Sequence, residues 1–316
     1  MSAANNSPAL PRVAVLILSY NGKELLEESV ASYLANDYPN FSVVVVDNGS
    51  VDGTADYVKR NFPDADLLRI EGNRGYSGGF NVGLDYAFRT LDADFALVTN
   101  NDVKADSAVV KELVKVAETD AAIGFVTGKV YYYDHPDVFQ TVGKGEDPVR
   151  WNGGSIGRGQ QDNGQFEEIE QRPFADDVFT LVSKPLYDAV GGYDPEFFLQ
   201  CEEYDWQARA KSEGFRIMYT PHAKIWHKES MTIGKTSPLK AFYDARNPMI
   251  VIMKHKSPEF FRRYVRVHFW RSIFKGSLRI VWRNFEVRRA FSMWRGFFSA
   301  LHWGFKHKKL GRSHFI

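Results

Sequence analysis

Three polar side chains at the end of a short apolar run mark the first place where this chain could carry chemistry. Asn100, Asn101 and Asp102 follow the run 95–99 directly. A run of this length between polar residues predicts a strand buried on both faces, and ligands of open α/β sheets bind beyond the carboxyl ends of such strands. Oxygen ligands there suit a hard cation with a phosphate. Only Asp102 of the three is charged, so a cation here needs further ligands from elsewhere in the chain.

A second cluster places three carboxylates within four residues. Glu202, Glu203 and Asp205 stand beside aromatic residues that include Trp206. One interpretation is the first turn of a helix, where acids favour the positive end of the helix dipole. The other is that crowding and burial desolvate one carboxylate, which makes it a candidate general base. We expect the first interpretation to account for one of the three acids and the second to hold for the site.

Asp47 ends another apolar run, 43–46, and is followed by Asn48 and a glycine turn. A carboxylate at this position can accept hydrogen bonds from a nucleobase or a ribose hydroxyl, and we favour this role over a purely structural one. The glycine-rich segment 71–83 fits neither the dinucleotide-binding nor the phosphate-loop pattern. Its glycines, with Arg74 near a helix start, suit an anion, although such turns also simply connect elements. His222 and His227 are both candidate metal ligands because the strand end at Asp102 is poor in acids, although a lone histidine is more often a core or surface residue.

The elements that must position these residues alternate between strand and helix over the first 130 residues, which predicts a mostly parallel sheet covered by helices. The predicted strands are 13–18, 43–46, 67–70 and 95–99. The predicted helices are 23–35, 54–61, 80–89 and 108–117, the last capped by Asp106 or Ser107. Segment 134–172 is polar and glycine-rich, which predicts long loops and a hairpin. Regular pattern returns at 178–186, at a helix over 205–212 stopped by Gly214, and in a helical region after Pro238.

Bulk composition limits the class of protein. The 316 residues are 44% apolar, enough for a sizeable core, and the single Cys201 excludes an intramolecular disulfide and fits a reducing cytoplasm. Segment 1–11 lacks the features of a signal peptide and is expected to be a disordered lead-in. No apolar run approaches the roughly 20 residues of a membrane-spanning helix, so we expect none.

Charge is divided unevenly along the chain. The net charge of +1 combines 16 Lys and Arg against two acids in 254–316, a net +14, with 24 basic and 37 acidic residues before it, a net −13. This asymmetry predicts an anionic surface as partner of 254–316. Within this region Trp270, Phe274, Leu278 and Trp282 recur every four residues, beside the basic row Arg271, Lys275, Arg279 and Arg283. The pattern favours a helix in an anionic membrane interface over nucleic acid, which is not expected as a partner. The alternative is a helix packed on the body of the protein with its basic side in water.

The joint order of several motifs resembles the inverting family-2 glycosyltransferases, in particular rhamnosyltransferase-like members that build bacterial surface polysaccharides. The resemblance covers about residues 12–250. The motifs are LSYN at 18–21, VVDNGSxDGT at 45–54, GNRGYSGGFNxG at 72–83, NND at 100–102, FFLQCEEYDW at 197–206 and IWH at 225–227. The resemblance implies a GT-A fold, a nucleotide-sugar donor and a divalent metal, Mg²⁺ or Mn²⁺.

Carried over residue by residue, the resemblance makes Glu203 the catalytic base and places the metal on Asp102 and His227. It makes Glu202, Asp205 and Trp206 acceptor-binding or supporting residues. The residues it assigns to the donor are Ser19, Tyr20, Asn21, Asp47, Asn48, Arg74, Gly78, Asn81, Asn100 and Asn101. Two departures stand out: Asn100 replaces an aspartate, which predicts weak metal binding until the nucleotide sugar arrives, and Glu203 replaces the more usual aspartate.

These expectations combine into one functional hypothesis. We expect a metal-dependent inverting transferase that moves a sugar, with L-rhamnose from dTDP-rhamnose as best candidate, to a lipid-linked or polysaccharide acceptor. We expect it at the cytoplasmic face of the membrane as a peripheral protein, with homo-oligomerisation possible. The alternatives are a UDP-hexose-dependent transferase, a nucleotidyltransferase and a catalytically silent binding protein. The expected units are a lead-in at 1–11, a nucleotide-sugar-binding half at 12–130, an acceptor-binding half at 131–237 and an extension at 238–316 that binds membrane or oligomerises.

Overall fold

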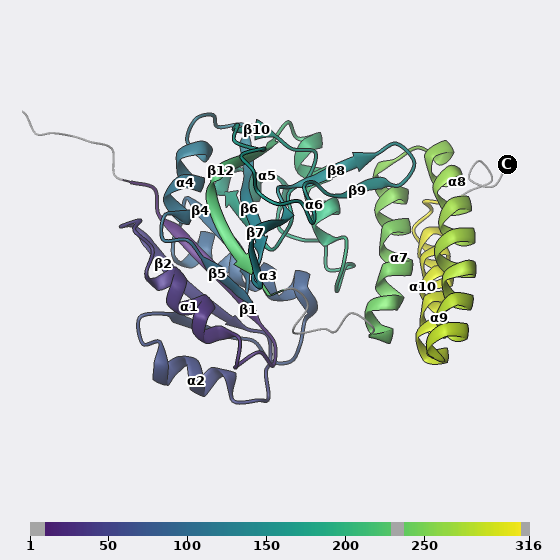
Figure 1. Ribbon diagram of the computed structural model, residues 1–316, viewed down its shortest axis with the longest axis horizontal. Helices are drawn as coiled ribbons and strands as arrows, with labels where there is room; N and C mark the ends of the chain where they lie inside the picture. Colours follow the sequence, from purple (N-terminus) through teal and green to yellow (C-terminus); the bar gives the residue numbers. More distant parts are fainter. Residues whose placement is uncertain (1–9, 229–236, 311–316) are drawn as a thin grey trace, which may run out of the picture.

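The computed structural model describes residues 10–228 and 237–310, and most of the predicted lead-in lies outside these ranges. A single large sheet has the strand order β10-β12-β6-β11-β4-β1-β2-β3, with β5 paired to β12 and β7 paired to β6. Its strands are β1 Val13–Ser19, β2 Phe41–Asp47, β3 Asp66–Arg69, β4 Phe95–Asn100, β5 Val103–Ala105, β6 Ile123–Tyr132, β7 His135–Thr141, β10 Glu170–Gln171, β11 Phe179–Ser183 and β12 Arg216–His227. Helices lie on both sides of the sheet (Figure 1). The predicted mostly parallel α/β sheet is confirmed.

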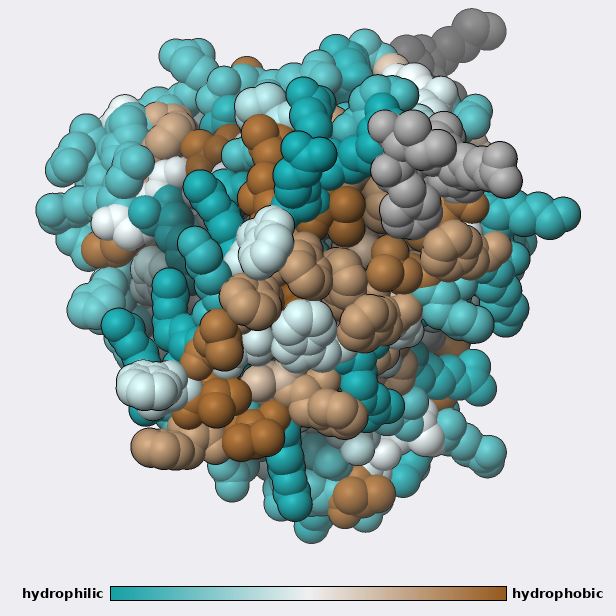
Figure 2. Space-filling model, turned by 90° about the vertical axis from the view of Figure 1, so that its right-hand side faces the viewer, coloured by the Kyte–Doolittle hydropathy of each residue, from teal (hydrophilic) through white to brown (hydrophobic). Residues whose placement is uncertain are grey.

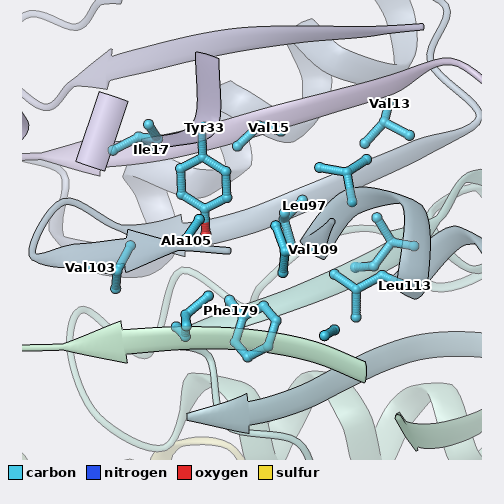
Figure 3. Close-up of a cluster of buried hydrophobic side chains, with 14 of the residues drawn as sticks. Val13, Val15, Ile17, Tyr33, Leu97, Val103, Ala105, Val109, Leu113 and Phe179 are labelled. Atoms are coloured by element: carbon cyan, nitrogen blue, oxygen red, sulfur yellow. The ribbon is translucent and has the colours of Figure 1, made fainter. Parts of the chain in front are cut away.

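Valine-rich runs build the first half of the sheet. β3, β2, β1 and β4 are parallel neighbours, and their inner residues are buried on both faces, as the unbroken apolar runs predict. On one face Val15, Ile17 and Leu97 pack against Tyr33 and Val109 from the covering helices (Figure 3). The helices of this half are α1 Leu26–Leu34, α2 Thr54–Asn61, α3 Gly75–Asp85, the π-helix η1 Tyr86–Thr90, and α4 Val109–Ala117.

The second half mixes strand directions. β11 runs antiparallel between β4 and β6, and β12 returns parallel to β6. The predicted hairpin in 134–172 is confirmed as β8 Lys144–Asp147 with β9 Trp151–Ser155, a separate two-stranded sheet. In Figure 1 this hairpin reaches from the sheet toward the C-terminal helices. Two helices complete this half, α5 Lys184–Val190 and α6 Glu202–Ser212.

The C-terminal region is helical, as predicted, and packs against the second half. Its elements are α7 Pro238–His255, α8 Pro258–Val267, the π-helix η2 His268–Phe274, α9 Lys275–Asn284 and α10 Val287–Lys306. Phe197 and Tyr204 of the second half share one buried cluster with Met249 of α7 and Phe297 and Ala300 of α10. The helices stand side by side at one end of the molecule (Figure 1). None of the described helices is long and apolar enough to cross a membrane.

Three predicted helix starts are wrong: the first helix begins at Leu26 instead of Lys23, and the other two differences lie at the site. The third helix begins at Gly75 instead of Phe80, so most of the glycine-rich segment is helical. Small residues let this helix lie close to the sheet, since a Cβ on Gly79 would lie 2.5 Å from the Leu18 side chain. The helix predicted from Asp205 begins at Glu202, so all three acids of the cluster lie in its first turn.

Candidate active site

Strand register brings the predicted donor residues together at one edge of the sheet. Ser19 at the end of β1 pairs with Asp47 at the end of β2, and Asn100 at the end of β4 pairs with the neighbouring Leu18. The carboxyl ends of three parallel strands thus meet, as the sequence predicts. Asn101 donates a hydrogen bond from its amide to Ser19 Oγ over 3.1 Å, which fixes the turn after β4.

A cleft of about 490 Å³ opens at this edge and extends to the start of α6. It is bounded by both halves of the sheet and by the first turn of α7. The predicted site residues that line it are Tyr20, Asn48, Asn100, Asn101, Asp102, Glu202, Glu203 and His227. Residues from five separate motifs of the sequence therefore face one volume, with the size of a small-molecule site.

Asp102 and His227 meet in the cleft. His227 Nε2 lies 3.1 Å from Asp102 Oδ1, and His227 Nδ1 lies 2.8 Å from the side-chain oxygen of Gln140; all three residues are buried. A ring nitrogen that donates to an amide oxygen leaves the opposite nitrogen free to act as a ligand, which is the arrangement common around metal-binding histidines. A carboxylate oxygen beside this nitrogen completes a donor pair that fits Mg²⁺ or Mn²⁺.

The loop before α6 presents the acids to the cleft. Gln200 and Cys201 have φ of 71° and 69°, two successive left-handed residues that turn the chain sharply into the helix. Asn247 of α7 is fully buried and donates from its amide to the carbonyls of Leu199 and Gln200. The C-terminal helices therefore hold the loop in a backbone conformation that non-glycine residues seldom adopt.

Gly75 joins the glycine-rich segment to the same loop. Its φ is +73°, and a Cβ there would lie 2.5 Å from the Phe198 ring. The next residue, Tyr76, donates its backbone N–H to Phe198 O over 2.8 Å. The start of α3 and the loop before α6 thus form one continuous wall of the cleft, and only glycine fits at their contact.

The acids of this wall form a crowded group. Asp177, from the loop before β11, has a carboxylate oxygen within 4.8 Å of those of Glu202 and Glu203, and all three residues are buried. Asp177 Oδ2 and Glu202 Oε2 find no hydrogen-bond partner among the described residues. Burial, and then the charge of Glu203, raise the pKa of both Asp177 and Glu202 well above the usual range.

Lys144 of β8 balances part of this charge. Its Nζ lies 2.6 Å from Glu203 Oε1 and 3.4 Å from Asp176 Oδ2. Burial lowers the pKa of Lys144, but Asp176 and Glu203 outweigh this and raise the pKa well above its usual value. Asp177, Glu202 and Glu203 are close enough to share a cation, and the lysine ammonium already supplies a positive charge there.

Two predicted donor residues belong to the floor of the cleft: Asn48 lines it, and Asp47 lies behind it. Asp47 is fully buried: its Oδ1 accepts the Ser50 N–H, and its Oδ2 has no hydrogen-bond partner among the described residues. Asn48 holds the glycine-rich segment by donating to Gly75 O and accepting from the Arg74 N–H. These contacts fix the floor of the donor half.

The other predicted donor residues, Asn21, Arg74, Gly78 and Asn81, do not line the cleft. Asn21 accepts the Val51 N–H with its side chain. Arg74 is exposed, and Gly78 packs against it within α3. Asn81 exchanges two hydrogen bonds with the backbone of Tyr193.

Asp205 and Trp206 also point away from the cleft, into the interior. Asp205 is fully buried and contacts Lys254, His255 and Arg209 at 2.5, 2.8 and 2.9 Å. Trp206 is 1% exposed and donates its indole N–H to Gly191 O. Neither residue can therefore contact an acceptor in the cleft, and both residues lie in supporting positions behind it.

Four residues of the site escaped the sequence analysis: Gln140, Lys144, Asp177 and Asn247. Lys144 and Gln140 belong to the segment predicted as loops, where periodicity gives no signal. The pair Asp176-Asp177 stands directly before the predicted strand 178–186, at its amino end. It is the one signal that could have been used, and it reaches the site because β11 runs antiparallel to β4.

The fold and the cleft define an α/β protein of the GT-A type. In structure the chain is similar to S. aureus TarS residues 1–349 in complex with UDP-GlcNAc, with a TM-score of 0.59 and 17% identity, covering 92% of this chain and 81% of TarS 1–349. It is also similar to the mannosyltransferase PcManGT from Pyrobaculum calidifontis in complex with GDP-Man and Mn²⁺, with a TM-score of 0.55 and 18% identity, covering 94% and 76%. At these identities the likeness establishes the fold.

The family follows from the sequence. Residues 11–242 match the model of "Glycosyltransferase like family 2", and the chain belongs to this family. It is 24% identical over 233 residues to poly-beta-1,6-N-acetyl-D-glucosamine synthase of Staphylococcus aureus (strain COL), covering 72% of this chain and 53% of the synthase. The chain thus spans about half the length of the curated relatives it matches.

Proposed function

We propose that this protein is a metal-dependent, inverting glycosyltransferase that moves a sugar from a nucleotide-sugar donor to an acceptor hydroxyl in surface-glycan synthesis. The observation that carries the proposal is the shared cleft: the carboxylate of Glu203 faces the same volume as Asn100-Asn101-Asp102 and His227. A general base and a site for a diphosphate are the two parts that a single displacement requires.

The proposed reaction requires only a general base, a metal site and hydrogen-bond donors from this chain. Glu203 accepts the proton of the acceptor hydroxyl while the hydroxyl oxygen attacks the anomeric carbon from the face opposite the nucleotide, so the configuration inverts. Asp102 and His227 would hold Mg²⁺ or Mn²⁺, which when bound neutralises charge on the leaving diphosphate. The amides of Asn100 and Asn101 lie at the same strand end and can donate hydrogen bonds to phosphate or sugar oxygens.

Two donors deserve direct comparison. The sequence resemblance favours dTDP-L-rhamnose, whereas the names of the curated relatives and of TarS with its ligand point to N-acetylglucosamine and UDP-GlcNAc. The test is transfer and hydrolysis of dTDP-rhamnose, UDP-GlcNAc and GDP-mannose with and without Mn²⁺. Glu203→Gln should retain donor binding, measured by thermal shift, and lose transfer by at least about a hundredfold.

Other outcomes separate the rival functions. Release of inorganic diphosphate together with nucleotide-sugar formation would instead identify a nucleotidyltransferase. Donor binding without turnover in the wild-type protein would identify a silent binding protein. Wild-type turnover by Glu203→Gln would remove this residue as the base.

We further propose that residues 254–316 attach the protein to the anionic cytoplasmic face of a membrane, where a lipid-linked acceptor is available. The stripe Trp270, Phe274, Leu278 and Trp282 is 53%, 38%, 56% and 85% exposed, so it is not packed on the body. Ile273 is the buried side of this segment. Figure 2 shows this end of the molecule, where hydrophobic side chains gather among hydrophilic ones.

The chemistry of this face suits lipid headgroups. Phe285, Phe291 and Phe298 add exposed rings to the stripe, at 84%, 64% and 58%, and the region carries the net charge of +14 counted above. Aromatic rings at the interface and basic side chains near anionic lipids, at about 1 kcal/mol each, both favour binding. α7, which shares a core with α10, contributes Ser237, Leu239 and Lys240 to the cleft, so the acceptor side of the site borders this end.

Vesicle flotation tests the membrane proposal. Binding to vesicles with one third phosphatidylglycerol should fall at least about tenfold in the double variant Trp282→Ser/Phe285→Ser. The reason is that burial of each ring in the membrane interface contributes about 1.5–3 kcal/mol to binding. Val51→Ser is the matched control, because Val51 is 86% exposed and lies in the loop between β2 and α2, outside the C-terminal region. Unchanged vesicle binding would contradict the membrane proposal, and a loss of dimers in the double variant would assign the face to a second copy of the chain.

A further inference from the structure

Lys144 enters the active site from a part of the chain 59 residues before Glu203. It begins β8, and its backbone is fixed by two hydrogen bonds with Phe174, of 2.7 and 3.2 Å. The side chain is 14% exposed, and its Nζ contacts Glu203 at 2.6 Å and lies 5.2 Å from the Tyr204 ring centre. The ammonium group is therefore held in place at the carboxylate proposed as the base.

The surroundings of Glu203 are strongly acidic. Asp176, Asp177 and Glu202 crowd the same wall, and Lys144 is the one ion-pair partner of Glu203 among the described residues. The other lysine that lines the cleft is engaged elsewhere, since Lys240 pairs with Asp244, and His227 is the proposed metal ligand beside Asp102.

The remaining titratable neighbours are uncharged. Burial raises the pKa of Tyr76, Tyr193 and Cys201 well above the usual values, and also raises that of Tyr204. Without the ammonium, the Glu203 carboxylate would stand beside buried acids with no opposite charge in contact, a situation that favours the neutral form of a carboxyl group. A neutral carboxylic acid cannot accept a proton from an acceptor.

We propose that Lys144 is a positioning residue that keeps Glu203 the ionised carboxylate of this cluster, so that Glu203 and neither Glu202 nor Asp177 acts as the base. The inference rests on the proposed function. In the reaction the acceptor O–H bond breaks and the new C–O bond forms at the anomeric carbon. The old C–O bond leaves its electron pair on the diphosphate, the proton passes to a Glu203 oxygen, and Lys144 keeps its own protons throughout.

The hairpin that carries Lys144 is anchored to the C-terminal helices. Lys256, just after α7, pairs with Glu146 at 3.1 Å and lies 4.6 Å from the ring centre of Trp151. Trp151 packs on Phe174, the residue that holds the Lys144 backbone. This provides a control, because Lys256→Met loosens the hairpin and leaves the ammonium on Glu203.

The experiment is the pH profile of kcat/KM for Lys144→Met and Lys144→Arg, with the donor that the wild-type enzyme uses. The acidic limb of this profile reports the base of the free enzyme. In Lys144→Met the limb should move up by at least about one pH unit, the effect of losing an opposite charge. Activity should therefore fall about tenfold at acidic pH and recover at high pH. Lys144→Arg and Lys256→Met should keep the wild-type limb.

The inference would be wrong if the acidic limb lay at the same pH in Lys144→Met and in wild type, or if Lys144→Met lost the same fraction of kcat/KM at every pH. Lys144 would then have a structural role. A second readout does not depend on turnover. In protein labelled with ¹³C in the glutamate carboxyl groups, the Glu203 resonance is identified by its absence from Glu203→Gln. This resonance should show protonation of the carboxylate at higher pH in Lys144→Met than in wild type. If the wild-type enzyme transfers no sugar from any donor, the proposed function fails, and this titration still decides for or against the ion pair.

Discussion

Replacing Asp205 by asparagine is expected to lower the free energy of unfolding by about 3 kcal/mol. Asp205 is fully buried, and it faces Lys254, His255 and Arg209 at 2.5–2.9 Å. Removing one partner of a buried ion pair costs about 3–5 kcal/mol, because the remaining charge is left uncompensated. Lys254 keeps a second partner, Asp194 at 2.6 Å, which places the expected loss at the lower end of that range.

The loss should depend on pH in a defined direction. Burial by itself raises the pKa of Asp205, but the hydrogen bond from His255 and the charges of Lys254 and Arg209 outweigh it and hold the pKa below its usual value. A lowered folded-state pKa gives stability that is present above the unfolded pKa of about 3.9 and is lost as the pH falls. The difference between wild type and Asp205→Asn should therefore be largest near pH 7 and shrink toward pH 3.

Urea unfolding at pH 7 and pH 3 measures this difference. Asp188→Asn is the matched control, since Asp188 makes an exposed i,i+4 pair with Lys184 and should change stability by no more than about 0.5 kcal/mol. The double variant Asp205→Asn/Lys254→Met should be less destabilised than the sum of its parts. A stability change below about 1 kcal/mol in Asp205→Asn, combined with a loss of acceptor affinity, would refute the argument and return Asp205 to the acceptor site.

Three further predictions concern the cleft. Gly75→Ala should lose about 2–4 kcal/mol of stability, because its left-handed φ and the contact with Phe198 both disfavour a Cβ; urea unfolding measures it, and a neutral effect would contradict the packing. Asp177→Asn should stabilise the protein, because burial and the charge of its neighbours raise the Asp177 pKa. A raised folded-state pKa lowers the stability of the wild type as the pH rises above about 4. Thermal unfolding should therefore show a gain in stability of the variant at pH 8 that vanishes near pH 4. Mn²⁺ should bind weakly to the free protein and more tightly with nucleotide sugar, and His227→Ala should abolish the donor-dependent part; calorimetry with equal affinities in both states would contradict this.

The sheet and its site edge were predictable because strand and ligand signals are local. Each of the runs ending at Leu18, Asp47 and Asn100 is apolar on both faces, and parallel strands necessarily bring such ends to one edge. The fold class needed no more than this alternation of runs and helices. The shortage of acids at Asp102 made a histidine ligand plausible, but the family resemblance was needed to select His227, since nothing in the local sequence joins residues 125 positions apart.

The remaining parts of the site could not be predicted, for physical reasons. Lys144 reaches Glu203 through a hairpin whose polar, glycine-rich sequence has no periodicity to follow. The start of α3 was placed too late because glycine has low helix propensity, whereas here close packing on β1 and β2 overrides it. Asn247 is an ordinary polar residue in the sequence, and its role depends on a loop 48 residues earlier.

The three acids of α6 show most clearly why residue type and local position do not determine a role. All of them lie in the first turn, so the helix dipole favours each of them equally. Successive helical residues point about 100° apart, and so each meets a different environment: Glu202 has an oxygen without a partner, Glu203 meets Lys144 at the cleft, and Asp205 meets Lys254 and its neighbours in the interior. Lys144 and Lys254 both come from distant segments of the chain. Tertiary structure therefore decides which acid of this turn is the candidate base and which one forms the buried ion pairs.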